Sequence, residues 1–343
     1  MVAGSLKKKG YNTDYTGFQY MVRKHGVRMN GKKVLIIGNG GASAAVQAVV
    51  RHEGAAQMVI VDIVEGNGAI SYEECYRSHL DAQVIINTSP VGMYPHGDAA
   101  PVDLERFARC EAVMDVIYNP LMTRLCQQAR KRGLVHVNGL EMLVAQAKQA
   151  VEHFLDKPVN DEVIDEIYRR LIAERCNIVL IGMPSAGKTS IASLTAARCG
   201  KRYIDMDDVI VETAGRFIPE IFAEEGEEGF RQRERDAAAQ LGTANGMIIS
   251  CGGGVIKNEA NMDALRQNGV VFFIDRDLSQ LISTDSNRPL SSSKEALAEM
   301  YAQRIGLYRR YADVIVDNNG DIETAAEAIA AQYAQAIHRA LSE

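Results

Sequence analysis

Two short apolar runs, each followed by a glycine-rich loop and then by a helix-forming stretch, constrain this chain more than any other feature. The first is Val34–Ile37, which precedes the loop Gly38–Ser43. The second is Asn177–Ile181, which precedes the loop Gly182–Gly187 and a helical stretch from Lys188. Neither run alternates polar and apolar residues, which is typical of a strand buried on both faces of a parallel sheet. Each unit therefore predicts the start of an α/β domain.

Further apolar runs follow each unit, and helical stretches separate them. This alternation predicts an α/β chain with two doubly wound parallel-sheet domains, residues 1–174 and 177–343, divided near Ala173–Cys176. A helix at 161–171 ends the first domain, and a helix at Ile322–Leu341 ends the second. The further expected strands are Met58–Asp62, Val84–Asn87, Val113–Val116, Met247–Ser250 and Val270–Ile274.

Charge and cysteine usage exclude some classes of protein. The net charge of −6 argues against a nucleic-acid-binding surface, which needs clustered Lys and Arg. The six cysteines include no C-x-x-C pair, which favours reduced thiols over a disulfide framework. No apolar stretch is long enough to span a membrane. We therefore expect a cytoplasmic protein with neither a nucleic-acid nor a membrane partner.

The second glycine loop fits the phosphate-binding pattern G-x-x-x-x-G-K-[ST] over Gly182–Thr189. In such a P-loop, successive backbone N–H groups and the N-terminus of the next helix surround the phosphates of ATP. Lys188 would reach the β and γ phosphates, and Thr189 would coordinate Mg²⁺. The alternative is a glycine turn that happens to precede Lys-Thr. The expected ATP-binding residues of this loop are Gly182, Ser185, Ala186, Gly187, Lys188, Thr189 and Ser190.

The segment Tyr203–Asp208 follows the expected P-loop helix and resembles the end of a second strand. Strand carboxyl ends are where α/β folds bind ligands. Asp205 and Asp207 would share one face of an extended segment, because side chains alternate along a strand. One could serve Mg²⁺ through water and the other could accept a substrate hydroxyl. The alternative is the acidic N-terminus of a helix, where Asp is also favoured.

Three later segments could complete a substrate site. Gly229–Glu234 places arginines on a charged helix, and one of them could bind a substrate carboxylate. Cys251–Val255 contains three successive glycines, which permit close approach of the backbone to a ligand. Asn287–Leu290 could form an arginine-bearing lid. Their alternatives are a solvated helix face, a tight turn and a surface loop.

In this order, and with an Arg-x-x-x-Tyr stretch at Arg304–Tyr308, these segments resemble shikimate kinase over nearly the whole second half. The resemblance implies phosphorylation of shikimate to shikimate 3-phosphate with ATP and Mg²⁺. It implies that Lys188 and Arg288 stabilise the transferring phosphoryl group, with Arg288 also at ATP. It further implies that Asp205 assists Mg²⁺ with Thr189. The implied shikimate-binding residues are Asp207, which would also orient or deprotonate the attacking hydroxyl, Arg231, Gly253 and Arg304.

Two other functions remain open for this half. It could be a P-loop kinase of another small molecule, such as a sugar acid or a nucleotide. The arginines Arg231 and Arg304 with Asp207 favour a small carboxylated polyol, and no aromatic residues cluster there to stack a base. It could also be a nucleotide-binding scaffold without activity. Four intact residues count against that class: Lys188, Thr189, Asp205 and Arg288.

The first glycine loop, Gly38–Ser43, resembles a dinucleotide-binding fingerprint of the Rossmann type, with Ser43 where the third glycine would fall. Asp62 ends the next expected strand. An acidic side chain there would bind the ribose 2′-hydroxyl of NAD and repel the 2′-phosphate of NADP. The alternative is an ordinary turn at the end of a strand.

Three segments of the first half resemble the C-terminal two thirds of shikimate dehydrogenase: Gly10–Asp14, Asn87–Pro95 and Asn138–Gln146. The resemblance implies that Asp14 is a catalytic carboxylate at the substrate and that Gln146 contacts shikimate. That family usually prefers NADP and carries an arginine after the second strand, which is absent at Asp62–Val64, so we expect NAD. The implied cofactor-binding residues are Gly38, Gly40, Gly41, Ala42, Asp62, Met93 and Gly139.

In that family a substrate domain precedes the Asn-Thr-Asp segment and supplies the catalytic lysine. Here Met1–Lys9 precede it. Lys7, Lys8 and Lys9 do not replace that lysine, because acid–base work needs a held geometry. We therefore expect the dehydrogenase module to be inactive alone. A partner fragment that supplies the substrate domain, or a gene start placed too late, would explain the same pattern.

Overall fold

The computed structural model describes residues 10–281 and 294–342, and these fall into two compact units. The first unit comprises the chain up to Met93 together with residues 99–118 and 128–169. The second comprises residues 94–98, 119–127 and the chain from Arg170 onward. The sequence places a single boundary between residues 174 and 177. In the structure the main boundary lies five residues earlier, after Arg169. Two short segments of the first half, residues 94–98 and 119–127, pack with the second unit.

The first unit is built on a parallel sheet in the order β3-β2-β1-β4-β5-β6. The chain runs outward from β1 in both directions, which is the strand order of dinucleotide-binding folds. The residue after β1 therefore lies at the switch point between β1 and β4, where such folds bind ligands. The strands are β1 Lys33–Ile37, β2 Gln57–Val61, β3 Ala69–Ile70, β4 Val84–Asn87, β5 Ala112–Asp115 and β6 Val135–Val137.

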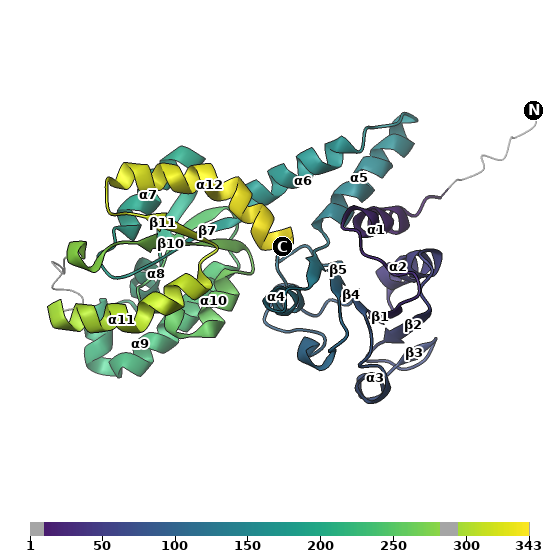
Figure 1. Cartoon of the computed structure of the whole chain (residues 1–343), viewed down its shortest axis with the longest axis horizontal. Helices are drawn as coiled ribbons and strands as arrows, with labels where there is room; N and C mark the ends of the chain where they lie inside the picture. The colour runs from purple at the N-terminus through teal and green to yellow at the C-terminus, as the bar shows by residue number, and fades with distance from the viewer. Residues whose placement is uncertain (1–9, 282–293, 343) are drawn as a thin grey trace, which may run out of the picture. The chain divides into compact units, whose positions relative to one another are not determined.

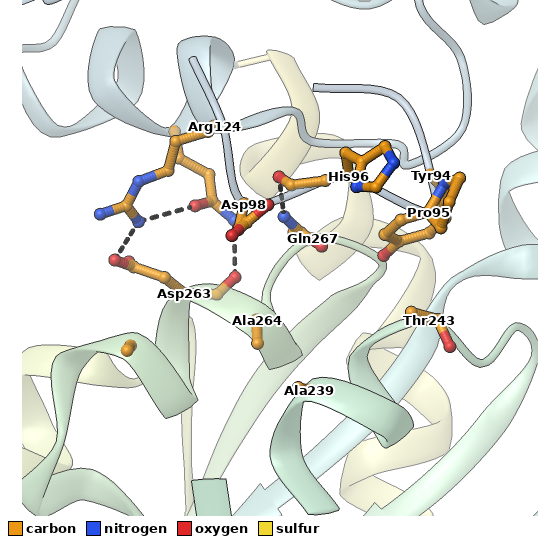
Figure 2. Close-up of a pocket in the computed structure, with 13 residues that line it drawn as sticks. Tyr94, Pro95, His96, Asp98, Arg124, Ala239, Thr243, Asp263, Ala264 and Gln267 are labelled. Carbon is orange, nitrogen blue, oxygen red and sulfur yellow. Dashed lines mark hydrogen bonds and ion pairs between the residues drawn. The ribbon is translucent and has the colours of Figure 1, made fainter. Parts of the chain in front are cut away.

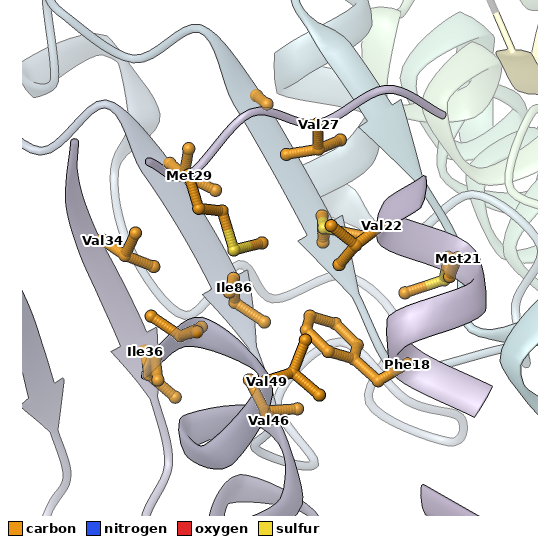
Figure 3. Packing of buried hydrophobic residues seen from close by; sticks show 14 of the residues in the cluster. Phe18, Met21, Val22, Val27, Met29, Val34, Ile36, Val46, Val49 and Ile86 are labelled. Atoms are coloured by element: carbon orange, nitrogen blue, oxygen red, sulfur yellow. The ribbon is translucent and has the colours of Figure 1, made fainter. Parts of the chain in front are cut away.

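Helices cover this sheet, and α1 contributes Phe18, Met21 and Val22 to its main apolar core. Figure 3 shows Phe18 directed at Val46 and Val49 of α2. Burial of these aliphatic and aromatic groups is the principal stabilisation of the layer. The helices are α1 Thr13–Lys24, α2 Gly41–His52, α3 Tyr72–Ser78, η1 Leu104–Arg106, α4 Arg124–Lys131, α5 Leu140–Leu155 and α6 Glu162–Arg175, of which α4 and α6 each extend across a unit boundary.

The second unit has a parallel sheet in the order β11-β10-β7-β9-β8, with β7 at its centre. All five residues of β7 are buried, as the unalternated apolar run predicts. The carboxyl ends of β7, β8 and β9 lie at one edge of the sheet and carry the residues described below. The strands are β7 Asn177–Ile181, β8 Arg202–Asp205, β9 Met247–Ser250, β10 Gly269–Asp275 and β11 Val314–Asp317.

Helices flank both faces of this second sheet. Figure 1 shows α7 and α12 together on one face, and α9, α10 and α11 on the other. The parallel sheet with helices on both faces confirms the doubly wound α/β prediction. The helices are α7 Lys188–Cys199, α8 Met206–Ala214, α9 Ile218–Gly242, η2 Val255–Lys257, α10 Glu259–Leu265, η3 Leu278–Gln280, α11 Lys294–Tyr311 and α12 Ile322–Ser342. Within the described part of the chain, none of the helices combines the length and the apolar character that crossing a membrane requires.

Candidate functional site

The loop between β7 and α7 has the backbone of a phosphate-binding loop. Gly182 has φ of +156°, and a Cβ there would lie 2.7 Å from the carbonyl oxygen of Ile274, so only glycine fits. Gly187 has φ of +81° and is the N-cap of α7. The Asn318 side chain donates to the Ala186 carbonyl at 2.8 Å and fixes the loop from β11. The first N–H groups of α7 therefore face the loop, as anion binding requires.

Lys188 is buried and reaches back across this loop. Its Nζ donates to the carbonyl oxygens of Gly182 at 3.0 Å and Met183 at 2.9 Å. These two bonds hold a positive charge inside the concave side of the loop. Ser185 and Ala186 lie in the same loop, and Ser190 lies on the first turn of α7. All seven P-loop residues predicted from the sequence therefore lie in one continuous segment.

Asp205 collects three hydrogen bonds at the end of β8. Its Oδ2 accepts from Thr189 Oγ1 at 2.8 Å and from Ser250 Oγ at 3.0 Å. Its Oδ1 accepts from the Asp207 N–H at 3.0 Å. A hydroxyl and a carboxylate beside a phosphate loop are the ligands through which Mg²⁺ is usually held, the rest being water and phosphate oxygens. The residues present therefore fit this ion.

The prediction that Asp205 and Asp207 share one face of an extended segment is wrong, and the alternative, the acidic N-terminus of a helix, is confirmed. The strand ends at Asp205, which is the N-cap of α8, and Asp207 lies in the first turn of that helix. The reason is local, because the Asp205 side chain satisfies the Asp207 N–H that the helix start leaves without a partner. Both carboxylates still reach the carboxyl edge of the sheet, Asp205 towards Thr189 and Asp207 towards Gly252.

The three successive glycines after β9 leave space for side chains that come from other elements. A Cβ at Gly252 would lie 3.0 Å from Oδ1 of Asp207. A Cβ at Gly254 would lie 2.2 Å from Nη1 of Arg231. Larger residues would therefore displace the two groups expected to bind substrate. Gly253 makes a different contribution, since its carbonyl oxygen accepts from Arg304 Nη1 at 2.9 Å and from Tyr308 Oη at 2.6 Å.

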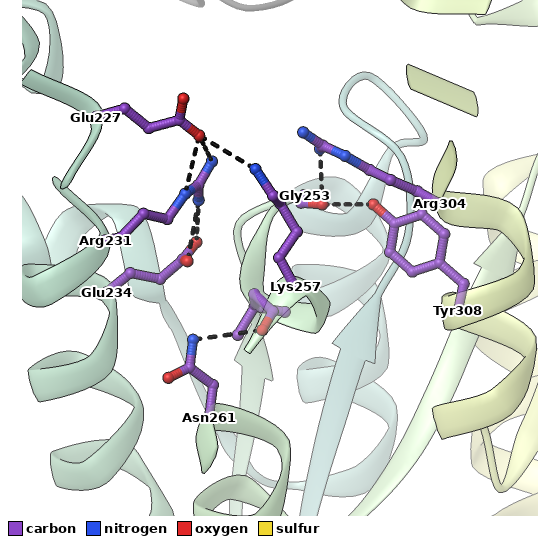
Figure 4. Close-up of polar contacts among 9 residues, drawn as sticks. Glu227, Arg231, Glu234, Gly253, Lys257, Asn261, Arg304 and Tyr308 are labelled. Carbon is purple, nitrogen blue, oxygen red and sulfur yellow. Dashed lines mark hydrogen bonds and ion pairs between the residues drawn. The ribbon is translucent and has the colours of Figure 1, made fainter. Parts of the chain in front are cut away.

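Arg231 extends from α9 into a cluster of charged groups (Figure 4). Its Nη1 donates to both carboxylate oxygens of Glu234, at 3.1 and 3.0 Å. Burial raises the pKa of Glu234, and Asp207 acts in the same direction, while Arg231 and Arg304 oppose it. Arg304 is held by α11, where Tyr308 stacks on Phe273 with ring centroids 5.1 Å apart.

The fold thus brings Asp207, Arg231, Gly253 and Arg304 together around the glycine turn, next to the loop that carries Lys188. Arg288, expected in the lid and at ATP, lies outside the described residues. Sequence reasoning assigned no role to Glu234, Ser250 or Tyr308, although each holds a predicted site residue. Glu234 had a signal, because it lies three residues after Arg231 and therefore on the same helix face.

The first unit brings its predicted residues together in two places. Gly38 has φ of +95° and follows β1. Asp62, one residue beyond β2, accepts from the N–H of Asn39 at 2.7 Å and from the N–H of Val64 at 3.0 Å. These backbone bonds, that from Val64 above all, lower the pKa of Asp62. Gly40 is the N-cap of α2, whose first two residues are Gly41 and Ala42.

The second place joins α1 to α5. The Gln146 side chain donates to Oδ1 of Asp14 at 2.7 Å, and Gly17 permits this close approach of the helices, since a Cβ there would lie 2.7 Å from Cγ of Gln146. Gly139 is the N-cap of α5, and a Cβ there would lie 2.0 Å from the Val116 carbonyl oxygen. Met93 is half exposed at the end of the segment that follows β4.

Sequence comparison decides the family of the second unit. A model of the family described as shikimate kinase matches residues 184–338. A shikimate kinase of Thiobacillus denitrificans is 40% identical over 152 residues, which are 43% of this chain and 83% of that protein. The chain belongs to the shikimate kinase family. A shikimate kinase of Clostridium beijerinckii is 39% identical over 145 residues, covering 41% of this chain and 85% of that relative.

Solved structures match each half of the chain separately. The shikimate kinase of Acinetobacter baumannii in complex with shikimate superposes with a TM-score of 0.45 at 30% identity, covering 50% of this chain and 97% of that one. A chorismate mutase/shikimate 5-dehydrogenase fusion protein of Clostridium acetobutylicum matches the N-terminal half with a TM-score of 0.44 at 36% identity. It covers 47% of this chain, and the present chain spans 62% of that protein.

The shikimate kinase unit also contains a hollow of about 460 Å³ that includes none of the predicted site residues (Figure 2). Gln127 donates from its side chain to the Asp263 carbonyl at 2.8 Å, and Gln267 donates to the Gly97 carbonyl at 2.5 Å. Arg124 pairs with the Asp263 carboxylate. Each polar group named here has a protein partner.

Proposed function

We propose that the second unit transfers the γ-phosphoryl group of ATP to the 3-hydroxyl of shikimate. The observation that carries this proposal is the convergence of Asp207, Arg231 and Arg304 on Gly252–Gly254. Two arginines suit the carboxylate of shikimate, and a carboxylate suits its ring hydroxyls. The same glycine turn lies at the sheet edge that carries the P-loop, so the bound hydroxyl and the γ-phosphate are near one another.

The candidate residues have different roles in an in-line phosphoryl transfer. Asp207 orients the attacking hydroxyl and accepts its proton as the new O–P bond forms. The bond between the γ-phosphorus and the bridging oxygen breaks, and ADP leaves with that oxygen. Lys188 and the loop N–H groups stabilise the charge on the phosphoryl oxygens, and Arg288 is proposed to act with them. Mg²⁺, held by Thr189 and Asp205 and by the phosphates, would neutralise phosphate charge.

The experiment is an assay of ADP release from the full chain with ATP and shikimate. Lys188→Met is expected to lower kcat by about 10²–10³-fold, because it removes one charge that acts on the transition state. No shikimate-dependent ADP release by the wild-type chain, with ATP still bound, would favour the nucleotide-binding scaffold. Turnover only with another carboxylated polyol or a nucleotide would favour the alternative kinase.

We infer a second function for the first unit, which is binding of a nicotinamide dinucleotide with preference for NAD over NADP. The observation in its favour is the position of Asp62, whose carboxylate faces the backbone of the glycine loop at Asn39. A negative charge there accepts a hydrogen bond from a ribose 2′-hydroxyl and repels a 2′-phosphate. Asp14 and Gln146 are proposed to contact shikimate in the same unit.

Calorimetric titration of the full chain with NAD and with NADP tests this inference. We expect tighter binding of NAD, and we expect Asp62→Ser to remove that preference by restoring affinity for NADP. Equal affinity of the wild-type chain for the two dinucleotides would contradict the role given to Asp62. Asp98→Ser serves as a control for the loss of one carboxylate elsewhere.

We also propose that the protein functions in the cytoplasm. All six cysteines are free thiols, five of them buried, and burial raises the pKa of Cys75 and Cys110 to about 11. Protonated buried thiols are compatible with a reducing compartment. Fractionation of cells that express the chain, followed by immunodetection, would contradict this proposal if the protein were exported.

A further inference from the structure

Glu227 is a carboxylate next to the substrate site to which the proposed mechanism gives no role. Its Oε1 accepts from Arg231 at Nε, 3.4 Å, and at Nη2, 3.2 Å. The same oxygen accepts from Lys257 Nζ at 3.2 Å. Figure 4 shows that this one oxygen of Glu227 accepts hydrogen bonds from two cations, Arg231 of α9 and Lys257 of η2.

The guanidinium of Arg231 is therefore bound on two sides by two different carboxylates. Glu234 takes Nη1, and Glu227 takes the edge formed by Nε and Nη2. The two differ in burial, because the side chain of Glu234 is 2% exposed and that of Glu227 is 48% exposed. Displacing Glu234 would leave a buried charge without its partner, which is costly, whereas Glu227 can return to water at small cost.

The edge that Glu227 occupies is one that a planar carboxylate uses to bind arginine through two parallel hydrogen bonds. A substrate carboxylate that binds Arg231 in this way requires the place of Glu227. One residue before Glu227, α9 is interrupted at Gly226, whose φ of 70° and ψ of −173° are not helical. The hydrogen bonds from Lys257 and then Arg231 also lower the pKa of Glu227, so the residue competes as an anion.

We propose that Glu227 is an internal stand-in for the substrate carboxylate, and that Lys257 is a further residue that binds this carboxylate. Glu227 holds Arg231 and Lys257 at the position where the substrate carboxylate binds. When substrate binds, its carboxylate displaces that of Glu227, so that one negative charge replaces another. Lys257 then lies beside the incoming carboxylate as a cation in addition to Arg231 and Arg304. This inference rests on the proposed phosphorylation of shikimate, and it assigns substrate affinity to a competition between two carboxylates.

The test compares steady-state kinetics of the full chain and of Glu227→Gln and Lys257→Gln. Removing the competing charge is expected to lower the KM for shikimate about three- to tenfold, and removing the cation to raise it by a similar factor, as suits partly exposed charge pairs. The KM for ATP and kcat stay within twofold. Glu228→Gln on the same helix and Lys157→Gln in the first unit are the matched controls.

A shikimate analogue with a neutral amide in place of the carboxylate separates exchange from mere support of the fold. The difference between wild type and Glu227→Gln should vanish with this analogue, and melting curves should show that both variants fold. A Glu227→Gln chain whose KM for shikimate is unchanged or higher would overturn the stand-in role. A Lys257→Gln chain that matches its control would overturn the role of Lys257.

The outcome for the wild-type chain distinguishes this inference from the function beneath it. Absence of shikimate-dependent ADP release in the wild type removes both the proposed function and the inference. Normal turnover by the wild type together with variants that behave like their controls removes the inference alone.

Discussion

Gly254 shows how a single absent atom affects the geometry of the proposed substrate site. The absent Cβ leaves the space that the guanidinium of Arg231 fills, at 2.2 Å from where that carbon would be. Arg231 in turn is oriented by Glu234, which is buried on the same helix face. The position of Arg231 therefore depends on Gly254, in the turn after β9, and on Glu234, in α9.

Gly254→Ala is accordingly expected to raise the KM for shikimate by at least about tenfold, because the added methyl displaces the guanidinium from its partner. The KM for ATP should stay close to that of the wild type. Gly306→Ala is the control, since a Cβ at this position in α11 meets nothing within 4 Å. That change should stabilise the chain by about 0.5–1 kcal/mol. Equal shikimate kinetics for the two variants would contradict the steric argument.

The buried carboxylate Glu141 makes the stability of the first unit depend on pH. It is buried, and its carboxylate pairs with His25 at 2.5 Å and with Lys24 at 3.0 Å. Burial raises its pKa, but the hydrogen bonds and charges of His25 and Lys24 outweigh burial and hold the pKa below the usual value. The pair therefore stabilises the fold above the unfolded pKa of about 4.3, and this contribution is lost as pH falls through the lower folded value.

Glu141→Gln should reduce the free energy of unfolding by about 1–3 kcal/mol at pH 7, because it removes charge-assisted hydrogen bonds. The difference from wild type should shrink as pH falls through the folded pKa. Urea unfolding at a series of pH values measures both effects. Glu105→Gln, at an exposed position in η1, is the control, and a Glu141→Gln difference that grows on acidification would contradict the assignment.

At the scale of elements, the ends of helices and strands in the kinase unit are held by side chains from neighbouring segments. Asn268, buried just before β10, is the clearest case. Its Oδ1 accepts from the Leu121 N–H at 2.9 Å, and its Nδ2 donates to Tyr94 Oη at 3.1 Å and to the Gly242 carbonyl at 3.3 Å. The side-chain amide of Asn268 thus forms hydrogen bonds with the last turn of α9 and with two segments from the first half of the sequence.

Asn268→Ala is expected to lower the free energy of unfolding of this unit by about 1–3 kcal/mol, since it leaves the buried Leu121 N–H without its acceptor. Asn245→Ala, at an exposed turn, should change it by no more than about 0.5 kcal/mol. Denaturant titration followed by circular dichroism measures both. Similar values for the two variants would show that the amide is not a structural link.

Element prediction also separated central strands from edge strands. The central strands β1, β4, β7 and β9 were predicted within one residue, because a strand buried on both faces has an apolar run that is visible in the sequence. The strands β3, β6 and β11 were not predicted, and each lies at the edge of its sheet, whereas the fourth edge strand, β8, was predicted in part from the segment Tyr203–Asp208. β11 alternates buried and exposed residues, with Ile315 50% exposed, so its pairing with β10 defines it more than its own composition does.

At the scale of the whole molecule, the chain carries two sheets with separate cores and separate candidate sites. Each sheet presents a glycine loop after its first strand, at the edge where the strand order reverses direction. The kinase family is established for the second unit, and the first has the strand order of a dinucleotide-binding fold. A ligand that binds one folded unit should therefore stabilise that unit by mass action.

We expect calorimetry of the full chain to resolve two unfolding transitions. Shikimate with a non-hydrolysable ATP analogue should raise the temperature of one transition, and NAD that of the other. In each case the free energy of unfolding of the unit should increase by about 2.7 kcal/mol at a ligand concentration one hundred times Kd. Asp62→Ser should allow NADP to stabilise the first unit as NAD does, and it should preserve the shift caused by shikimate with the ATP analogue. A single transition that every ligand moves alike would contradict two separately folding units.

The sequence by itself determined the two α/β units, the phosphate-binding loop and the identity of most candidate residues in the second unit. These features depend on short-range patterns, namely apolar runs, glycine spacing and residues a few positions apart. Only the tertiary structure decided that Gly254 makes room for Arg231 and that Glu227 and Lys257 meet beside the proposed substrate site. These relations join residues far apart in the chain, and they arise because parallel strands bring their carboxyl ends to one edge of a sheet.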